Sequence, residues 1–93
     1  MFPLARFKIS DNSMLPNFKE GDFVLVNKLF FNLKENEVIV FEKENRFLIK
    51  RVGKIEGNKI FVVSDNPAGQ DSRHFGPISK NEIIGKVIFR AKG

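Results

Sequence analysis

Ser13 and Lys50 are the residues of this chain whose types and surroundings could together carry nucleophilic chemistry. A serine hydroxyl is a poor nucleophile until a neighbouring base takes its proton. Histidine is the usual base, and the chain has only one. A lysine can replace histidine if its pKa falls far enough to leave the amine neutral. The two residues therefore raise the hypothesis of a serine hydrolase with a lysine base.

The neighbours of Lys50 supply a reason for such a pKa. Residues 47–52 have the pattern of a β-strand, and because side chains alternate along a strand, Leu48, Lys50 and Val52 share one face. An unperturbed lysine is neutral only about 0.04% of the time at pH 7, so burial would have to supply roughly 3–5 kcal/mol. The same pattern also fits a strand lysine whose amine reaches out to water, and periodicity alone favours that alternative.

Short strands separated by turns must position these two residues. Apolar and polar side chains alternate over residues 5–10, and turns rich in Gly, Asn, Asp and Glu bound the later strands. Those strands are expected at residues 23–26, 38–41, 46–55, 59–63 and 83–89. Gly85 interrupts the last one, which predicts a bulge or a close backbone approach. Helical turns fit residues 16–20 and 79–82 alone, so the predicted fold class is all-β and barrel-like.

The composition limits what this chain can be. Its 93 residues, 42% of them hydrophobic, are enough for one core, so residues 1–93 are expected to form a single domain. With no cysteine and one histidine, we expect no disulfide, no metal site and no cofactor. No apolar run approaches the roughly 20 residues that span a bilayer. The expected location is cytoplasmic, or membrane-associated if the chain is part of a longer anchored protein.

The net charge of +5 would allow attraction to nucleic acids or to an anionic membrane. The basic residues are nevertheless scattered, and no run of Lys and Arg exceeds two. We therefore interpret the charge as solvated surface and expect no nucleic acid partner, while peripheral contact with a membrane stays open.

A polar loop over residues 64–77 is long for so small a domain, and loops of that length are usually functional or disordered. Asp71 and Arg73 can form a charge-assisted pair that holds the loop. Asp65 and Asn66 can satisfy nearby backbone groups. A plain turn with a surface ion pair explains the same residues equally well.

Together these motifs resemble the signal peptidase I family of serine proteases, which use a Ser/Lys dyad. The resemblance rests on an ordered set of segments that covers residues 7–89: Ser13–Pro16, Gly21–Val26, Lys50–Val52, Asp65–Pro67, Asp71–Ile78 and Ile84–Val87. The small size is similar to the short branch of nickel-type superoxide dismutase maturation proteases. The resemblance implies a small signal peptidase/LexA-like β-barrel-type catalytic domain that removes a leader or pro-segment from a precursor protein.

The resemblance also implies a role for each matching residue. Ser13 would be the nucleophile and its backbone N–H one oxyanion donor, and Lys50 would be the general base. Asp71 and Arg73 would form a structural salt bridge beneath the site, with Asp65 and Asn66 in support. Met14 and Pro16 would shape the turn that presents Ser13 and would border the substrate. The precursor would bind as an extended strand beside residues 7–12 and the strand before Lys50, with small side chains next to the cut.

Three departures from the family pattern concern the oxyanion donors and the lysine. Asp11 stands where the family usually has a serine that completes the oxyanion hole. Because a carboxylate would repel the oxyanion, we expect Asp11 to point away, which leaves Ser10 or Asn12 as candidate second donors. Ser64 replaces the glycine of a Gly-Asp-Asn motif, and the loop is one residue shorter than usual. The serine that orients the lysine therefore has no counterpart; Gly69 lies nearby, and Ser64 is a candidate substitute.

Three alternatives remain beside the protease. A LexA-like self-cleaving regulator shares several motifs, but only twelve residues precede Ser13, and the Ala68–Gly69 pair that resembles its cut site lies downstream. A non-catalytic basic β-barrel would need exposed aromatic and basic side chains on one face. A triad of Ser13, His74 and Asp71 is disfavoured because His74 and Asp71 are only three residues apart.

Overall fold

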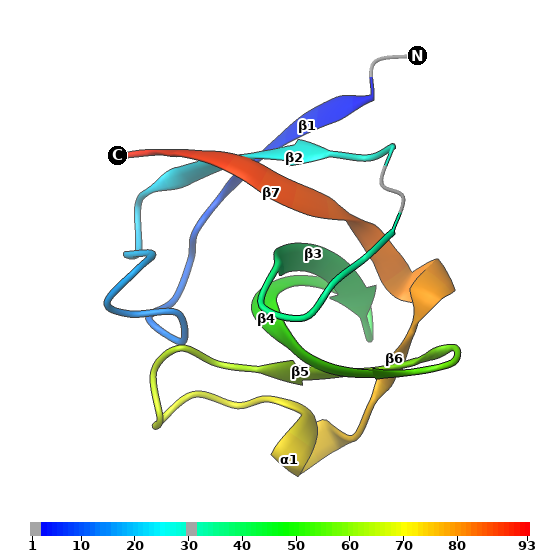
Figure 1. Cartoon of the computed structure of the whole chain (residues 1–93). Coiled ribbons are helices and arrows are strands. Elements are labelled where there is room, and N and C mark those ends of the chain that lie inside the picture. The colour runs from blue at the N-terminus through cyan, green and yellow to red at the C-terminus, as the bar shows by residue number, and fades with distance from the viewer. Residues whose placement is uncertain (1–2, 30–31) are drawn as a thin grey trace.

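The computed structural model describes residues 3–29 and 32–93, and strands make up most of its regular structure (Figure 1). The elements are β1 (Leu4–Lys8), β2 (Phe23–Asn27), β3 (Val38–Lys43), β4 (Arg46–Glu56), β5 (Lys59–Val63), α1 (Ser72–Phe75), β6 (Ile78–Ser79), the 3-10 helix η1 (Lys80–Glu82) and β7 (Ile83–Ala91). The predicted all-β class is confirmed, and each expected strand is present.

All seven strands of the described residues join one antiparallel sheet in the order β1-β2-β7-β3-β4-β5-β6. β1 and β6 end the sheet without pairing to each other, so the sheet is not closed into the barrel that we expected. A reason is the brevity of β6, whose two residues offer little edge for a further strand. In Figure 1, β1, β2 and β7 lie above the β3–β4 hairpin, and β5 and β6 lie below it.

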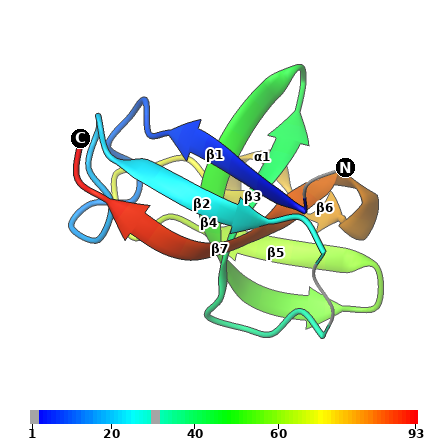
Figure 2. The ribbon, with the colours of Figure 1, turned by 90° about the horizontal axis from the view of Figure 1, so that it is seen from above.

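The β3–β4 hairpin is closed by a two-residue turn and carries Lys50 in its second strand. Lys43 pairs with Arg46, and the intervening Glu44 and Asn45 have positive φ angles of 52° and 63°, as a type I′ turn requires. β5 pairs with β4 only from Arg51 onwards, so the edge of residues 46–50 that faces away from β3 has no partner strand among the described residues. Figure 2 shows this hairpin projecting to one side of β1 and β2.

Two hydrophobic clusters meet at β3, whose residues 38–41 are buried on both faces. Odd and even positions of this strand face different clusters because side chains alternate. The first cluster contains Ile9, Met14, Phe18, Val24, Val26, Val38, Val40 and Ile49. The second contains Ile39, Phe41, Val52, Ile60, Val62, Ile78 and Ile83. The segment of Ser13 is anchored in the first cluster, and the strand face of Lys50 continues into the second.

The helical prediction was wrong for the polar loop. α1 forms there because the Asp71 carboxylate accepts a hydrogen bond from the Arg73 N–H, and the His74 side chain accepts one from the Asp71 N–H. The helix is too short for an apolar period to reveal it. Of the two segments expected to hold helical turns, residues 79–82 contain η1, and residues 16–20 contain turns without an assigned helix.

Gly85 sits at a bulge and against a neighbouring strand, as predicted. The register of β3 with β7 shifts between Val40 and Phe41, next to Gly85. A Cβ atom at this position would clash with the backbone oxygen of Asn27 and would lie 2.6 Å from Cγ1 of Val26. The approach of β2 to β7 thus requires a residue without a side chain.

Gly85→Ala is expected to lower the free energy of unfolding by about 1–3 kcal/mol, because the backbone of β2 must move to make room for the methyl group. Denaturant titration followed by circular dichroism measures this change. Gly57→Asn is the control, since Gly57 has a φ of +60°, which Asn tolerates, and open space around it. Equal stability of the two variants would contradict the packing argument.

Candidate active site

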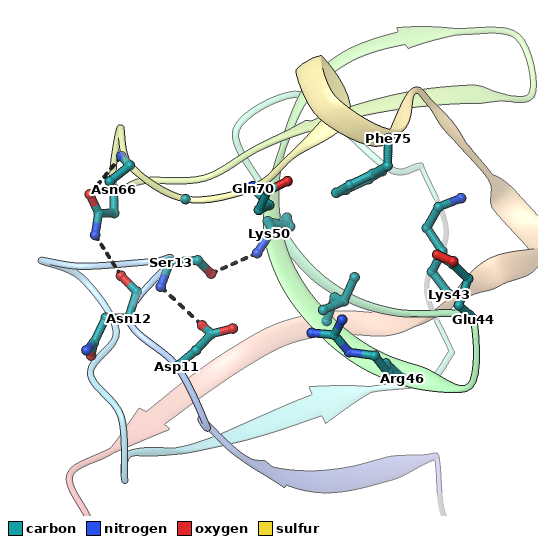
Figure 3. A pocket seen from close by; sticks show the side chains of 13 residues that line it. Asp11, Asn12, Ser13, Lys43, Glu44, Arg46, Lys50, Asn66, Gln70 and Phe75 are labelled. Atoms are coloured by element: carbon teal, nitrogen blue, oxygen red, sulfur yellow. Dashed lines mark hydrogen bonds between the residues drawn. The ribbon is translucent and has the colours of Figure 1, made fainter.

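Ser13 and Lys50 lie side by side although 37 residues separate them. Lys50 Nζ donates a hydrogen bond to Ser13 Oγ at 2.7 Å (Figure 3). Ser13 is in the turn region between β1 and β2, and Lys50 is in the middle of β4. The Lys50 side chain is 3% exposed, between the half-buried Leu48 and the fully buried Val52. The strand face inferred from the sequence is therefore confirmed, and the alternative of a solvated amine is not what the structure has.

The surroundings of Lys50 favour its neutral form. Burial lowers the pKa of Lys50, because an ammonium ion loses its hydration there. The charges of Asp11 and Asp71 oppose this shift, and that of Arg46 adds to it, with the balance leaving the pKa below its usual value. A neutral amine at 2.7 Å from a hydroxyl can accept its proton, which is the chemistry required of a general base.

Met14 anchors the turn that carries Ser13. Its side chain is fully buried in the first cluster, and its Sδ accepts a hydrogen bond from the Asp65 N–H at 3.4 Å. The N–H groups of Asn17 and Phe18 both donate to the Met14 carbonyl. Neither Met14 nor Pro16 lines the cleft at Ser13, so the structure gives both residues a place in the turn and not on the cleft wall.

The polar loop holds the Ser13 turn from the other side. The Asn66 N–H donates to the Ser13 carbonyl at 2.9 Å, and Asn66 Nδ2 donates to the Asn12 carbonyl at 3.0 Å. Gly69 packs so closely that a Cβ there would lie 2.6 Å from Ser64 Oγ and 3.0 Å from Ser13 Cβ. The predicted involvement of Asn66 near the site thus takes the form of direct backbone contacts.

A two-pronged ion pair joins this loop to the strand of Lys50. Arg51 Nε donates to Asp65 Oδ1 at 2.8 Å, and Arg51 Nη2 lies 2.7 Å from Asp65 Oδ2. Asn17 Nδ2 donates to the same carboxylate at 2.8 Å. The hydrogen bonds from Arg51 lower the pKa of Asp65, against the opposing effect of burial. We call Arg51, Asp65 and Asn17 the clamp.

The clamp was not predicted from the sequence. Asp65 was expected to satisfy nearby backbone groups and to support the site, whereas no role was predicted for Arg51 or Asn17. The available signal was an arginine and an aspartate in two of the matched motifs, which have the chemistry to form a bidentate pair if the fold brings them together.

Asp71 and Arg73 form the ion pair expected from the sequence. Arg73 Nε and Nη2 donate to the fully buried Asp71 carboxylate at 2.9 and 3.0 Å, and the Ser64 N–H donates to it at 2.9 Å. Burial opposes ionisation, but these hydrogen bonds outweigh it and hold the pKa of Asp71 at about 2. Ser64 Oγ donates to the Gln70 carbonyl, so the structure does not place Ser64 as the residue that orients Lys50.

The expectation that Asp11 points away from the oxyanion position was wrong. Asp11 Oδ1 accepts a hydrogen bond from the Ser13 N–H at 3.1 Å. A short carboxylate side chain readily bonds to the backbone two residues further on, and this local preference prevails over repulsion from an oxyanion that is absent in the free protein. Of the two candidate second donors, Asn12 lines the cleft and Ser10 lines a smaller groove beside it.

His74 is not placed for a triad in this structure. Its Nδ1 accepts a hydrogen bond from the Asp71 N–H at 3.1 Å, which makes it part of the cap of α1. His74 also does not line the cleft that contains Ser13 and Lys50. Lys50 is thus the base that the geometry offers to Ser13.

A cleft of about 600 Å³ opens over Ser13 and Lys50 (Figure 3). Its walls come from the Ser13 turn, the β3–β4 hairpin, the polar loop and α1. The lining residues are Asp11, Asn12, Ser13, Lys43, Glu44, Arg46, Leu48, Lys50, Asn66, Ala68, Gly69, Gln70 and Phe75. Within residues 3–29 and 32–93 there is no group of three or more His, Asp or Glu side chains arranged to hold a metal ion. The described residues also include no helix of the length and hydropathy needed to cross a membrane.

Comparisons with known proteins place this chain among peptidases. The family model described as Peptidase S24-like matches residues 3–88. The chain is 23% identical to the signal peptidase I of Bacillus caldolyticus, over 97% of this chain and 80% of that protein. It is 26% identical to signal peptidase I V of Bacillus subtilis (strain 168), over 87% of this chain and 82% of that protein. These alignments run over 146 and 137 residues, so both relatives carry segments that this chain lacks.

Removal of the clamp carboxylate should destabilise the fold. Asp65→Ala leaves Arg51 and Asn17 without their shared acceptor, and we expect a loss of about 1–2 kcal/mol in the free energy of unfolding, measured by denaturant titration. Hydrogen exchange of the amides of residues 12–18 should accelerate as well. Glu56→Ala is the matched control because it removes an exposed ion pair with Lys54 on the same strand. If Asp65→Ala proved as harmless as Glu56→Ala, the clamp would not hold the site together.

Proposed function

Since the chain belongs to the Peptidase S24-like family, we propose that it is a serine endopeptidase in which Ser13 is the nucleophile and Lys50 the general base. The observation that carries this proposal is the 2.7 Å separation of Ser13 Oγ from the buried Lys50 Nζ. A protonated lysine could not accept the hydroxyl proton, so the lowered pKa of Lys50 supports the same assignment.

The proposed reaction follows from this pair. Neutral Lys50 takes the proton of Ser13 Oγ as the oxygen attacks the peptide carbonyl, and the resulting ammonium gives that proton to the leaving amine. Water then attacks the acyl-serine ester, with Lys50 again as base, and releases the carboxylate product. The Ser13 N–H is one donor to the oxyanion, and the second donor stays unassigned.

We expect the substrate to bind as an extended strand in the cleft. Among the described residues, the edge of residues 46–50 that faces away from β3 has no partner strand, and residues 7–11 line a small groove together with residues 47–49. The rings of Phe7 and Phe47, 5.2 Å apart between centroids, both line this groove. An added strand could pair with either edge through its backbone, while the cleft receives alternate side chains.

The proposed substrate is a protein precursor from which a leader or pro-segment is removed, with small side chains beside the cut. The relatives named signal peptidase I make a precursor the natural choice. The narrower assignment to nickel-type superoxide dismutase maturation stays a prediction, as do the cytoplasmic location and the single domain of residues 1–93.

A self-cleaving regulator is the second candidate, because Ala68 and Gly69 line the cleft near Ser13. Their backbone, however, is folded into a turn by bonds from the Ala68 N–H to Asn66 Oδ1 and from the Gly69 N–H to the Asn66 carbonyl. A scissile peptide is normally bound extended, so these residues serve better as a cleft wall. An intact mass after long incubation of the purified chain would exclude cleavage at this pair.

Replacing either member of the pair should abolish cleavage. Ser13→Ala removes the attacking oxygen, and Lys50→Met removes the base but keeps a long buried chain, so each should lower kcat at least about 100-fold. Digestion of a proteome-derived peptide library, read by mass spectrometry, reports these losses together with the preferred cut site. Lys54→Ala, an exposed lysine of the same strand, is the control that should retain activity. Full activity of Lys50→Met would rule out the lysine base.

The pH dependence should reveal which base acts. Because Lys50 works in its neutral form, kcat/KM should rise with pH through the pKa of Lys50, with a midpoint below the ordinary lysine value of 10.5. The measurement is the rate on one cleaved peptide from pH 5 to 10, alongside circular dichroism to verify folding. A rising limb that disappears in His74→Ala would instead identify the histidine as the base.

A further inference from the structure

The backbone N–H of Ser13 is already occupied in the free protein. Asp11 Oδ1 accepts its hydrogen bond at 3.1 Å, and the Asp11 carboxylate lies in the cleft beside the nucleophile (Figure 3). This N–H is the group that the proposed reaction needs for the oxyanion. One donor therefore has two competing acceptors, the Asp11 carboxylate and the carbonyl oxygen of the substrate.

The two acceptors cannot share the site during the reaction. The substrate oxygen gains negative charge as the tetrahedral intermediate forms, and a carboxylate on the same N–H would repel it. Asp11 is exposed at the cleft, so its side chain can rotate towards water. Rotation would leave the N–H free for the substrate without a rearrangement of the core.

Asp11 also affects the base. Its charge raises the pKa of Lys50 against the lowering effect of burial, and the charge of Asp71, at the N-cap of α1, acts in the same direction. Arg46 of β4 acts in the opposite direction, and Lys43 and Glu44 line the cleft from the tip of the β3–β4 hairpin. Asp11 is the acidic group that combines an effect on the base with a bond to the nucleophile's N–H.

We propose that Asp11 is a positioning residue that blocks the oxyanion donor in the free protein, because its carboxylate accepts the hydrogen bond of the Ser13 N–H until a substrate carbonyl displaces it. This inference rests on the proposed function of Ser13 and Lys50. The device would make cleavage depend on a substrate that binds well enough along the cleft to displace the carboxylate, and would suppress cleavage of short or poorly bound peptides.

Two substitutions separate this role from that of a turn-forming side chain. Asp11→Asn keeps an oxygen that can accept the Ser13 N–H but removes the charge, and Asp11→Ala removes both the acceptor and the charge. Glu56→Gln is the control, because it removes one negative charge from the exposed β4–β5 hairpin, away from the cleft.

The first test is the pH profile of kcat/KM on a short peptide found in the library digestion. Asp11→Ala should raise kcat/KM by about tenfold, the net worth of one displaced charge-assisted hydrogen bond. Both Asp11 variants should shift the rising limb to lower pH, since the negative charge that favours the ammonium is gone, while Glu56→Gln leaves it in place. A fall in kcat/KM with an unshifted limb, in variants that stay folded, would overturn the proposal and leave Asp11 a turn residue.

The second test does not depend on cleavage. In a ¹⁵N-labelled sample, the Ser13 amide should exchange slowly with solvent in the wild type, and distinctly faster in Asp11→Ala. Unchanged exchange would overturn the contact itself. Absence of cleavage by the wild type and every variant would overturn the proposed function, and a slow Ser13 amide would then identify the contact as a turn without a catalytic consequence.

Discussion

The ion pair of Arg51 with Asp65 is the interaction on which the geometry of the site depends. Arg51 directly follows Lys50 in β4, and Asp65 directly precedes Asn66, whose N–H binds the Ser13 carbonyl. The two planar groups meet through parallel hydrogen bonds of 2.8 and 2.7 Å, which fix direction as well as distance. Asn17, which follows Ser13 in the same turn region, donates a hydrogen bond to the same carboxylate. The backbones that carry nucleophile and base are thereby held to one common point.

The packing around Ser13 and Lys50 explains how a lysine can remain buried. The Ser13 turn is anchored by Met14, which is buried in the first cluster. Lys50 lies on the same strand face as Leu48 and Val52, which pack in or against the second cluster. A buried ammonium would be costly there, and the Ser13 hydroxyl at 2.7 Å is a partner for the neutral amine. Stability of the fold and basicity of the lysine are thus set by the same burial.

Much of this arrangement could be predicted from the sequence because it follows from local periodicity. The alternation of Leu48, Lys50 and Val52 identified their common face, and Gly85 marked the bulge in β7. The proximity of Ser13 and Lys50 was predicted from the order of the motifs, because no periodicity relates residues 37 positions apart. The ion pair of Arg51 with Asp65 was not predicted because long-range ion pairs leave no local sequence pattern. The hydrogen bond from the Ser13 N–H to Asp11 was not predicted for another reason. Repulsion between the Asp11 carboxylate and an oxyanion arises only in the transition state, and the free protein contains no oxyanion.

The charges near Lys50 are best understood as opposing one another. Burial and Arg46 favour the neutral amine, while Asp11 and Asp71 favour the ammonium. Asp71 is locked by Arg73 and by the Ser64 N–H, so its contribution is constant at any pH well above its pKa of about 2. Asp11 is exposed and held locally by the Ser13 N–H, so its contribution can change when a ligand enters. A substrate that displaces Asp11 would therefore free an oxyanion donor and favour the neutral form of Lys50 in one movement, which couples binding along the cleft to the chemistry at Ser13.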